Sequence, residues 1–412
     1  MEWKHYKMDD VIDEISMGPF GSDVKKEFYV NKGIPILNGS NLQGFKLQEN
    51  SFGYLTEEKA DSLNKCNAHR GDIIVTHRGT LGQIVYVPSD SKYDRYVISQ
   101  SQFRFRCKPD LVDVQYLVYY FHTREGQYKI LANASQVGVP ALARATSTFR
   151  LIDIKLPSLA DQRRIASILS SLDRKIELNN KINADLEEMA QAIFKNWFVD
   201  FEPFKDGKFV DSELGMIPEG WKVGTLGEFC KCLLGGTPSR SKEEYWNGEV
   251  NWINSGEINK FRILEASEKI TELGLAKSAT KLLPKKTTVL AITGATLGQV
   301  SLLEIDTCAN QSVIGVLENT EVPYEYIYPF IKDRIEMLIQ HQTGGAQQHI
   351  NKDNVESLIF LLPTINVLED YISLVSPMYK RIESQCFENL YLSLLRDTLL
   401  PRLMSGELEV PE

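Results

Sequence analysis

Two long stretches of the chain carry apolar residues at alternating steps of four and three. The first runs from 157 to 201 and the second from 363 to 407, and each begins at the proline of a Leu-Pro pair. This spacing predicts two long helices with a narrow apolar seam, as in a coiled coil. Both seams turn polar at the same two steps, and an asparagine in a seam typically fixes register and partner. We therefore expect the helices to pair along the residues Ile165, Leu169, Leu172, Ile176, Asn183, Val375, Met378, Ile382, Asn389 and Leu392.

The segments that precede the two helices also repeat. With an offset of 216 residues, Tyr29 aligns with Tyr245, and the run Thr-Leu-Gly-Gln at 80–83 aligns with the same run at 296–299. A repeat unit of roughly 200 residues is far longer than a solenoid repeat, so each copy is expected to fold as a domain. The pattern predicts four parts, namely a domain at 1–157, a helix at 158–202, a domain at 203–363 and a helix at 364–412.

Within each copy, the pattern favours an α+β fold. Residues 71–76 and 83–87 are expected to form a hairpin around a glycine-containing loop, and 287–293 with 299–303 to repeat it. A helix is expected next, over 114–131 in the first copy and 324–341 in the second. The segment 203–220 has the composition of a linker.

Composition and charge restrict the function. A chain of 412 residues with 43% apolar and 25% charged side chains is expected to form two or three globular domains. The net charge is −9, with +2 over residues 1–157 and −6 over residues 206–363. A protein that grips a long stretch of DNA alone usually has a basic face. Either this chain does not bind nucleic acid, which composition alone favours, or other subunits supply most of the phosphate contacts. The start of the chain has no apolar signal core, so we expect a cytoplasmic protein without a membrane segment.

A search for catalytic motifs favours a protein that is not an enzyme. The sequence contains no G-x-x-x-x-G-K-[ST] phosphate loop, no two adjacent prolines, no G-x-G-x-x-G after a strand and no H-E-x-x-H. The six cysteines include no C-x-x-C pair, so we expect reduced thiols and no metal site. His77 and His349 are interpreted as loop residues without a chemical role.

Five motifs in order give the chain a family resemblance. Residues 236–240 (GTPSR) and 18–22 (GPFGS) resemble the two common openings of target recognition domains in type I restriction–modification specificity subunits. Residues 156–176 resemble the central conserved region of that family. Residues 217–221 (IPEGW) resemble the start of its second domain, and 400–408 its C-terminal end. The resemblance covers nearly the whole chain, and the five motifs together are far more specific than any one of them.

The resemblance implies the rest of the architecture and the partners. It implies two tandem α+β target recognition domains, separated by two long helices that pair as an antiparallel coiled coil in a pseudo-twofold repeat. Each domain would read one block of a bipartite site on double-stranded DNA, and the helices would dock two methyltransferase (modification) subunits. Restriction/translocase subunits would complete the complex. The chain itself would hold no cofactor, while S-adenosylmethionine, ATP and Mg would be held by the partner subunits.

Loop residues that can bond base edges or phosphates are the candidates for DNA contact. Arginine pairs well with guanine, and glutamine with adenine, in the major groove. Because Thr-Leu-Gly-Gln recurs in two domains that should read different sequences, Leu81 and Gly82 are interpreted as structural. Arg78 aligns with Gly294 and therefore better suits sequence-specific contact; Trp246 and Trp252 are expected in the core. The candidates are Arg78, Thr80, Gln83, Gln136, Ser239, Arg240, Lys242, Tyr245, Thr293, Thr296, Gln299, Gln347, Gln348 and His349.

Two alternatives stay open at this stage. One is an orphan or regulatory two-domain DNA-binding protein outside a restriction system. The other is a nuclease or methyltransferase fragment whose motifs have degenerated.

Overall fold

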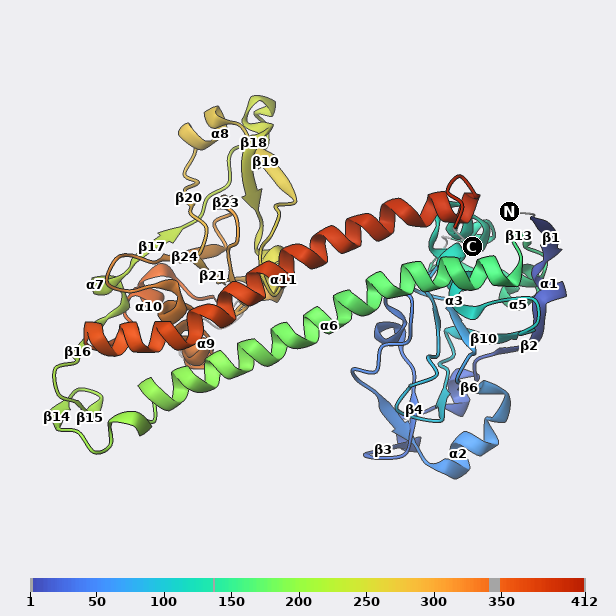
Figure 1. Cartoon of the computed structure of the whole chain (residues 1–412), viewed down its shortest axis with the longest axis horizontal. Coiled ribbons are helices and arrows are strands. Elements are labelled where there is room, and N and C mark those ends of the chain that lie inside the picture. Colours follow the sequence, from blue (N-terminus) through green and yellow to red (C-terminus); the bar gives the residue numbers. More distant parts are fainter. Residues whose placement is uncertain (1–2, 136–137, 341–348, 411–412) are drawn as a thin grey trace. The chain divides into compact units, whose positions relative to one another are not determined.

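The computed structural model describes residues 3–135, 138–340 and 349–410. The chain divides into two compact units (Figure 1). Unit 1 comprises Met1–Lys175 with Tyr391–Glu412, and unit 2 comprises Ile176–Leu390. Each unit therefore holds one α+β half together with a segment of each long helix. Candidates Gln136, Gln347 and Gln348 lie outside the described residues.

Unit 1 is built on two sheets and two short strand pairs, β1–β13 and β11–β12. The first sheet is antiparallel, in the order β2-β10-β7-β8, and the second has the order β3-β5-β4-β9-β6. β1 pairs with β13 just before the first long helix begins. The strands are β1 (Lys4–Lys7), β2 (Ile12–Met17), β3 (Tyr29–Val30), β4 (Ile34–Ile36), β5 (Gly53–Leu55), β6 (Asn67–His69), β7 (Ile73–Thr76), β8 (Ile84–Tyr86), β9 (Arg95–Val97), β10 (Gln102–Cys107), β11 (Ala134–Ser135), β12 (Ala141–Leu142) and β13 (Asp153–Leu156). The helices are α1 (Met8–Val11), α2 (Glu57–Ser62), α3 (Val114–His122), α4 (Arg124–Leu131) and α5 (Ala145–Arg150).

Unit 2 repeats this topology. Its sheets have the orders β17-β24-β21-β22 and β19-β18-β23-β20, and β16 pairs with β25 as β1 pairs with β13. The strands are β14 (Phe209–Ser212), β15 (Gly215–Pro218), β16 (Lys222–Thr225), β17 (Lys231–Leu234), β18 (Trp246–Ile253), β19 (Glu268–Ile270), β20 (Leu282–Leu283), β21 (Thr288–Ala291), β22 (Val300–Leu302), β23 (Thr307–Ala309), β24 (Val313–Leu317) and β25 (Ile359–Leu362). The helices are α7 (Leu226–Phe229), α8 (Glu272–Ala276), α9 (Tyr324–Gln340) and α10 (Lys352–Glu356). The internal repeat and the two predicted hairpins, β7–β8 and β21–β22, are confirmed.

Both predicted long helices form, as α6 (Leu159–Phe198) and α11 (Ile365–Ser405), and they run antiparallel. In unit 1, the early α6 residues Ile165 and Leu169 share a buried core with Leu400 and Leu403 of late α11. In unit 2, the C-terminal part of α6 packs on the N-terminal part of α11, so the two helices are antiparallel there as well. At the seam, Val375 and Ile382 are buried, and Met378 is half-buried beside the buried Tyr379. Leu172, Ile176 and Leu392 are also half-buried.

The polar steps of the seam form a hydrogen-bonded layer inside unit 2. The amide nitrogen of Gln385 donates to Asn179 at 3.0 Å, and that of Asn179 donates to Asn389 at 2.8 Å. Asn183 Nδ2 donates to the sulfur of Cys386 at 3.5 Å. An amide pair satisfies its partners only in one register, so this layer specifies how the two helices align.

Two expectations are wrong in detail. The helix expected over 114–131 is broken at Thr123, whose hydroxyl donates to the Tyr120 carbonyl and accepts from the Gly126 amide. This N-cap ends α3 and starts α4. The segment 203–220 is not a simple linker either, because it contains the hairpin β14–β15, and Phe204 packs edge-on against Trp221.

A buried ion network holds the elements of unit 2 together. Arg262, whose side chain is 1% exposed, donates to Glu187 of α6 at 2.5 Å. Glu187 also accepts from Tyr328 at 2.6 Å and Lys332 at 2.8 Å, both on α9. Burial alone would raise the pKa of Glu187, but Arg262 and Lys332 outweigh it and hold that pKa below its ordinary value. Nearby, the ammonium group of Lys286 contacts the carboxylate of Glu304 at 2.6 Å.

Unit 1 uses a different contact at the helices. Arg396 of α11 donates to Asp173 of α6 at 2.7 Å, and the hydroxyl of Tyr119 on α3 donates to the same carboxylate. The guanidinium of Arg396 also lies 5.0 Å from the ring centre of Phe45. The repeat thus keeps the topology of each half, while the side chains that tie each half to the helices differ.

Glycines shape the turn that follows the first sheet strand in each half. Gly18 follows β2, and a Cβ at this position would overlap the carbonyl oxygen of Ser99. Gly235 follows β17, and a Cβ there would overlap the carbonyl oxygen of Asn310. Backbone cannot yield as a flexible side chain can, so both positions require glycine.

The ion network predicts a large effect of Arg262→Met. This change leaves Glu187 buried with fewer partners, so we expect the free energy of unfolding to fall by about 3 kcal/mol. Urea unfolding followed by circular dichroism measures it. Lys195→Met, which removes an exposed partner of Asp200, is the control and should cost less than about 1 kcal/mol. Equal effects of the two changes would contradict a structural role for the network.

The glycine contacts predict that Gly18→Ala and Gly235→Ala each destabilise their own unit. Forcing a methyl group against a backbone carbonyl should cost about 1–3 kcal/mol. Gly39→Ala is the matched control, because a Cβ there has only an ordinary contact at 3.7 Å with Gln83. Urea unfolding of the three variants compares them, and a Gly18→Ala protein as stable as Gly39→Ala would refute the steric explanation.

Candidate nucleic-acid interface

Three segments of unit 1 meet at one end of the antiparallel sheet. They are the glycine turn at 18–23, the β7–β8 loop at 77–83 and the turn before β10 at 99–101. The amide of Gly18 donates to the carbonyl of Gln102 at 2.8 Å, and the amide of His77 donates to that of Ser101 at 2.9 Å. Backbone bonds thus fix all three segments, and their exposed side chains form one surface.

Unit 2 brings the equivalent segments together in the same way. The amide of Gly235 donates to the carbonyl of Val313 at 3.0 Å, and the amide of Ile292 donates to the carbonyl of Ser312 at 2.9 Å. The hydroxyl of Thr237 donates to the Gln311 side chain at 2.5 Å. Each half therefore offers the same backbone frame with different side chains.

The β7–β8 loop separates its candidates into exposed and inward-facing residues. Arg78 and Thr80 are exposed. Gln83 instead turns inward, donating to the carbonyl of Gly39 at 3.0 Å and accepting from Thr76 at 3.0 Å. Gly82 has φ +85° and packs against Gln127 of α4, which supports the structural interpretation of the Thr-Leu-Gly-Gln run. Arg78 and Thr80 are thus the better candidates of this loop.

A later segment of each half joins this loop. In unit 1, Arg78 forms an isolated β-bridge with Ala141, and the amide of Leu142 donates to the carbonyl of His77 at 2.8 Å. In unit 2, Thr293 forms the same kind of bridge with His349, which is exposed. Two segments far apart in the sequence therefore contribute to one surface in each half, as the sequence interpretation grouped them. Thr293 and Thr296 are half-buried and Gln299 is exposed.

The segment 239–245 of unit 2 is more constrained than the sequence suggested. Arg240 makes two bonds to the carboxylate of Glu268, at 2.5 and 3.0 Å, and its guanidinium lies 3.6 Å from the ring centre of Trp246. The hydrogen bonds between the two side chains raise the pKa of Arg240 and lower the pKa of Glu268. Tyr245 is buried, with its hydroxyl 3.0 Å from the ammonium group of Lys242.

The rest of that segment divides by exposure. Ser239 and Lys242 are exposed. The expectation of a core tryptophan is confirmed for Trp252, which is 2% exposed, whereas Trp246 is half-buried beneath Arg240. Arg240 is also exposed, but it would have to give up its ion pair with Glu268 to contact a phosphate or a base, so Ser239 and Lys242 are the stronger candidates.

The structure adds residues that the sequence interpretation did not single out. Phe20 and Gln100 are exposed in unit 1 beside Arg78. Gln311 of unit 2 occupies the position of Gln100. The alignment of Gln100-Ser101 with Gln311-Ser312 is visible in the sequence and could have identified the glutamines. Phe20 gave no such signal, because an apolar residue between glycines reads equally well as core.

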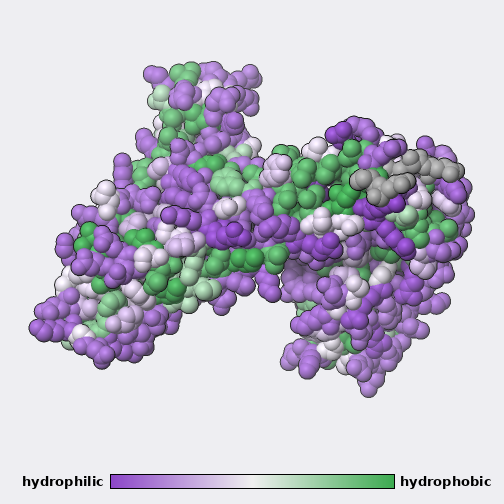
Figure 2. All heavy atoms as spheres, in the orientation of Figure 1, coloured by the Kyte–Doolittle hydropathy of each residue, from purple (hydrophilic) through white to green (hydrophobic). Residues whose placement is uncertain are grey.

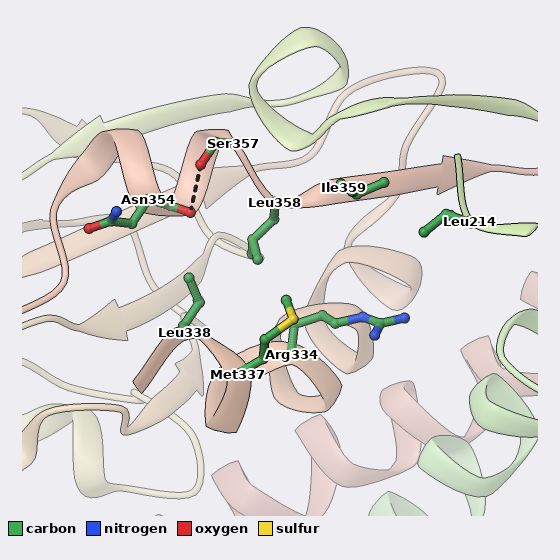
Figure 3. Close-up of a pocket in the computed structure, with 8 residues that line it drawn as sticks. All are labelled: Leu214, Arg334, Met337, Leu338, Asn354, Ser357, Leu358 and Ile359. Atoms are coloured by element: carbon green, nitrogen blue, oxygen red, sulfur yellow. Dashed lines mark hydrogen bonds between the residues drawn. The ribbon is translucent and has the colours of Figure 1, made fainter. Parts of the chain in front are cut away.

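A cavity in unit 2 lies apart from these loops. It has a volume of about 300 Å³, and its lining is mostly apolar. Leu338 of α9 and Leu358, next to β25, project into the space between these elements, with Leu214 at one side (Figure 3). Among the candidate DNA-contacting residues that the structure describes, none lines this cavity.

Within the described ranges, no three or more His, Cys, Asp or Glu side chains are grouped so as to hold a metal ion. No helix in this part of the chain combines the length and the hydropathy needed to cross a bilayer.

Comparison with known proteins identifies the family. The family model for the type I restriction modification DNA specificity domain matches residues 1–188 and 218–384. The chain is 27% identical to the type I restriction enzyme MjaIX specificity subunit of Methanocaldococcus jannaschii, covering 100% of this chain and 94% of that protein. It is 23% identical to the HindI specificity subunit of Haemophilus influenzae, over 99% and 100% of the two chains.

A solved structure shares the fold. The S subunit of a type I restriction–modification system from M. genitalium superposes with a TM-score of 0.60 at 17% sequence identity, covering 98% of this chain and 96% of that chain. The two α+β halves and the long helices are thus an architecture seen in a solved S subunit. With matches in both halves, the chain belongs to the type I restriction–modification DNA specificity family.

Proposed function

We propose that this chain is the sequence-reading subunit of a type I restriction–modification complex, and that each half reads one block of a bipartite site on double-stranded DNA. The observation that carries the proposal is the repeated surface of the two halves. Gly18 and Gly235, Gly82 and Gly298, and Gln100 and Gln311 occupy equivalent places in it. The side chains between them differ, which is what two readers of two different sequences require.

The first half offers the clearer base-reading residue. Arg78 is exposed at the tip of the β7–β8 loop, and the equivalent residue of unit 2 is Gly294, which has no side chain. An arginine can form two bonds to the O6 and N7 atoms of guanine. A residue present in only one half supports a role in sequence choice rather than in the shared frame.

The long helices are the proposed docking site for two methyltransferase subunits. Two large apolar residues of α11 in unit 1, Tyr391 and Leu394, are each 65% exposed. Figure 2 shows hydrophobic atoms gathered over the part of α11 nearer its C-terminal end. Exposed apolar stripes of this kind mark protein interfaces. The methyltransferases would carry S-adenosylmethionine, and restriction/translocase subunits would supply ATP- and Mg-dependent steps.

Chemistry in this chain itself is not part of the proposal. All six cysteines are free and buried. Burial raises the pKa of Cys107, Cys230 and Cys232 to about 12, so their thiols stay protonated and are poor nucleophiles near neutral pH. We infer a non-catalytic cytoplasmic subunit whose partners perform methylation and cleavage.

Exchange of one half tests the proposal. Replacing residues 1–156 with the corresponding segment of another specificity subunit should change one block of the methylated site and leave the other block unchanged. Single-molecule sequencing of the methylated genome, with the partner genes expressed, reads both blocks. The wild-type chain is the control. A swap that alters both blocks would show one composite reading surface, and methylation independent of this gene would favour a regulator outside restriction.

A point change tests the reading residue. Arg78→Ala should relax one base position in the first block, at a cost of about 1–3 kcal/mol in discrimination, because one side chain reads one base pair. Lys242→Ala in unit 2 is the comparison and should not affect that position. Methylome sequencing with graded expression measures both variants. Unchanged specificity for Arg78→Ala would remove Arg78 from the base-reading set.

A further inference from the structure

Phe20 is the most exposed large apolar side chain of the described residues, at 82% exposure. It is not on a loose segment. The amide of Phe20 donates to the Asp23 carboxylate at 3.2 Å, and the amide of Asp23 donates to the Phe20 carbonyl at 2.9 Å. This ordered turn holds the phenyl ring outward, although burial would be favourable for a side chain of this size.

The fold does not require an aromatic residue at this point. In unit 2, the second residue after the equivalent glycine, Gly235, is Thr237, a small polar residue that bonds Gln311. The glycine is therefore followed by a threonine in one half and by an exposed phenylalanine in the other. Phe20 leads into a 3-10 turn at Gly21–Asp23, whereas in the described residues of unit 2 no such turn follows Thr237. The phenyl ring of Phe20 therefore either contacts another molecule or makes no contact.

The ring stands at the rim of a groove in unit 1 with a volume of about 890 Å³. Its lining combines apolar and polar groups, namely Met17, Phe20, Lys65, His77, Arg78 and Gln100. Lys65, Arg78 and Gln100 are exposed. The carboxylate of Asp23, also in the lining, already accepts a backbone amide. Burial lowers the pKa of His77, so its ring is mostly neutral near pH 7.

We propose that Phe20 stacks on, or inserts beside, a base of the bound DNA at the first block, with Arg78 reading a base edge across the groove. This rests on the proposed function and adds a contact that only one half makes. The exposed cations Lys65 and Arg78 lie beside an aromatic ring. This combination suits DNA, which is a polyanion with flat bases, better than it suits an apolar surface of a protein partner. The half that contains them is also the one with the positive net charge, +2 against −6 for residues 206–363.

The contact differs in kind from that of Arg78. Every base has a flat face, so stacking adds affinity and local unstacking but little sequence preference. Phe20 is thus a positioning residue for the first block. Thr237 cannot do the same, so the distortion should occur at one end of the bipartite site only.

The experiment uses the full chain assembled with the methyltransferase subunits of its restriction–modification system. The probe is a duplex carrying the site that wild-type protein methylates, with 2-aminopurine at successive positions in and around both blocks. Because methyltransferases flip out the bases that they modify, 2-aminopurine is not placed at those bases or next to them. At the remaining positions, we expect wild type to raise 2-aminopurine fluorescence at a step of the first block and at none of the second. Phe20→Ala should abolish the signal and weaken binding by roughly five- to 150-fold, while Phe20→Trp should retain both.

Tyr128→Ala is the matched control, because Tyr128 is an aromatic side chain on α4 with 75% exposure. It should leave binding and fluorescence unchanged, and all variants should unfold at the wild-type urea concentration. The methylated sequence should stay the same for Phe20→Ala, in contrast to Arg78→Ala. That readout separates stacking from base reading.

Three outcomes overturn the inference. Unchanged binding and fluorescence for Phe20→Ala would leave the ring without a DNA role. Loss of co-purification with the methyltransferase, at unchanged DNA binding by the complex that remains, would make Phe20 a protein contact. Relaxed sequence choice would make it a specificity residue. If wild type itself gives no bipartite methylation, the proposed function fails instead, and the two failures are distinguishable.

Discussion

The hydrogen-bonded layer between α6 and α11 is the constraint on which the rest of the helix pair depends. An apolar seam alone tolerates a shift by one heptad, because leucine packs on leucine in either register. The amide chain from Gln385 through Asn179 to Asn389 is satisfied in one alignment only. The layer has a cost, since Gln385 Oε1 and Asn183 Oδ1 are buried and find no partner among the described residues. In return, the layer gives the helix pair one specific alignment.

Each half is fastened to its helix segments by its own polar contact, and the two contacts differ in burial. In unit 2, Arg262 and Glu187 form a largely buried pair. In unit 1, Arg396 and Asp173 are partly exposed, each at 18%. Buried pairs are costly to break, while partly exposed pairs are screened by salt. Rising ionic strength should therefore affect the attachment in unit 1 first.

The acidic second half seemed ill-suited to DNA from its formal charge, and the structure reduces that difficulty. Several of its carboxylates are committed to internal contacts. Glu268 pairs with Arg240, and Glu257 accepts from Ser267 and Lys260. Burial raises the pKa of Glu304 and of Glu318, so these groups ionise less readily than exposed carboxylates. Net charge counts side chains, whereas a DNA-binding surface depends on the charges that face outward.

Sequence reasoning succeeded where one periodicity decides the structure and failed where single contacts decide it. The long helices, the repeat and the hairpins follow from patterns that extend over many residues. The break at Thr123 depends on one hydroxyl that caps α4, and the hairpin in 203–220 has no strong alternation. Within the candidate interface, the pattern pointed to loops that the structure brings together, but it could not orient their side chains. The side chain of Gln83 turns inward and bonds Gly39. The exposure of Phe20 depends on the local conformation of the turn that follows β2.

The division between frame and surface has a consequence for how such a chain can vary. The glycines at 18 and 235 are fixed by backbone overlap, and the turns at 82 and 298 by positive φ. Any change at these positions costs stability before it can affect recognition. Positions 20 and 78 are exposed on the same turns, and their counterparts in unit 2 are a threonine and a glycine. Substitution there costs the fold little, so new recognition can arise at these points while the frame and the helix pair stay unchanged.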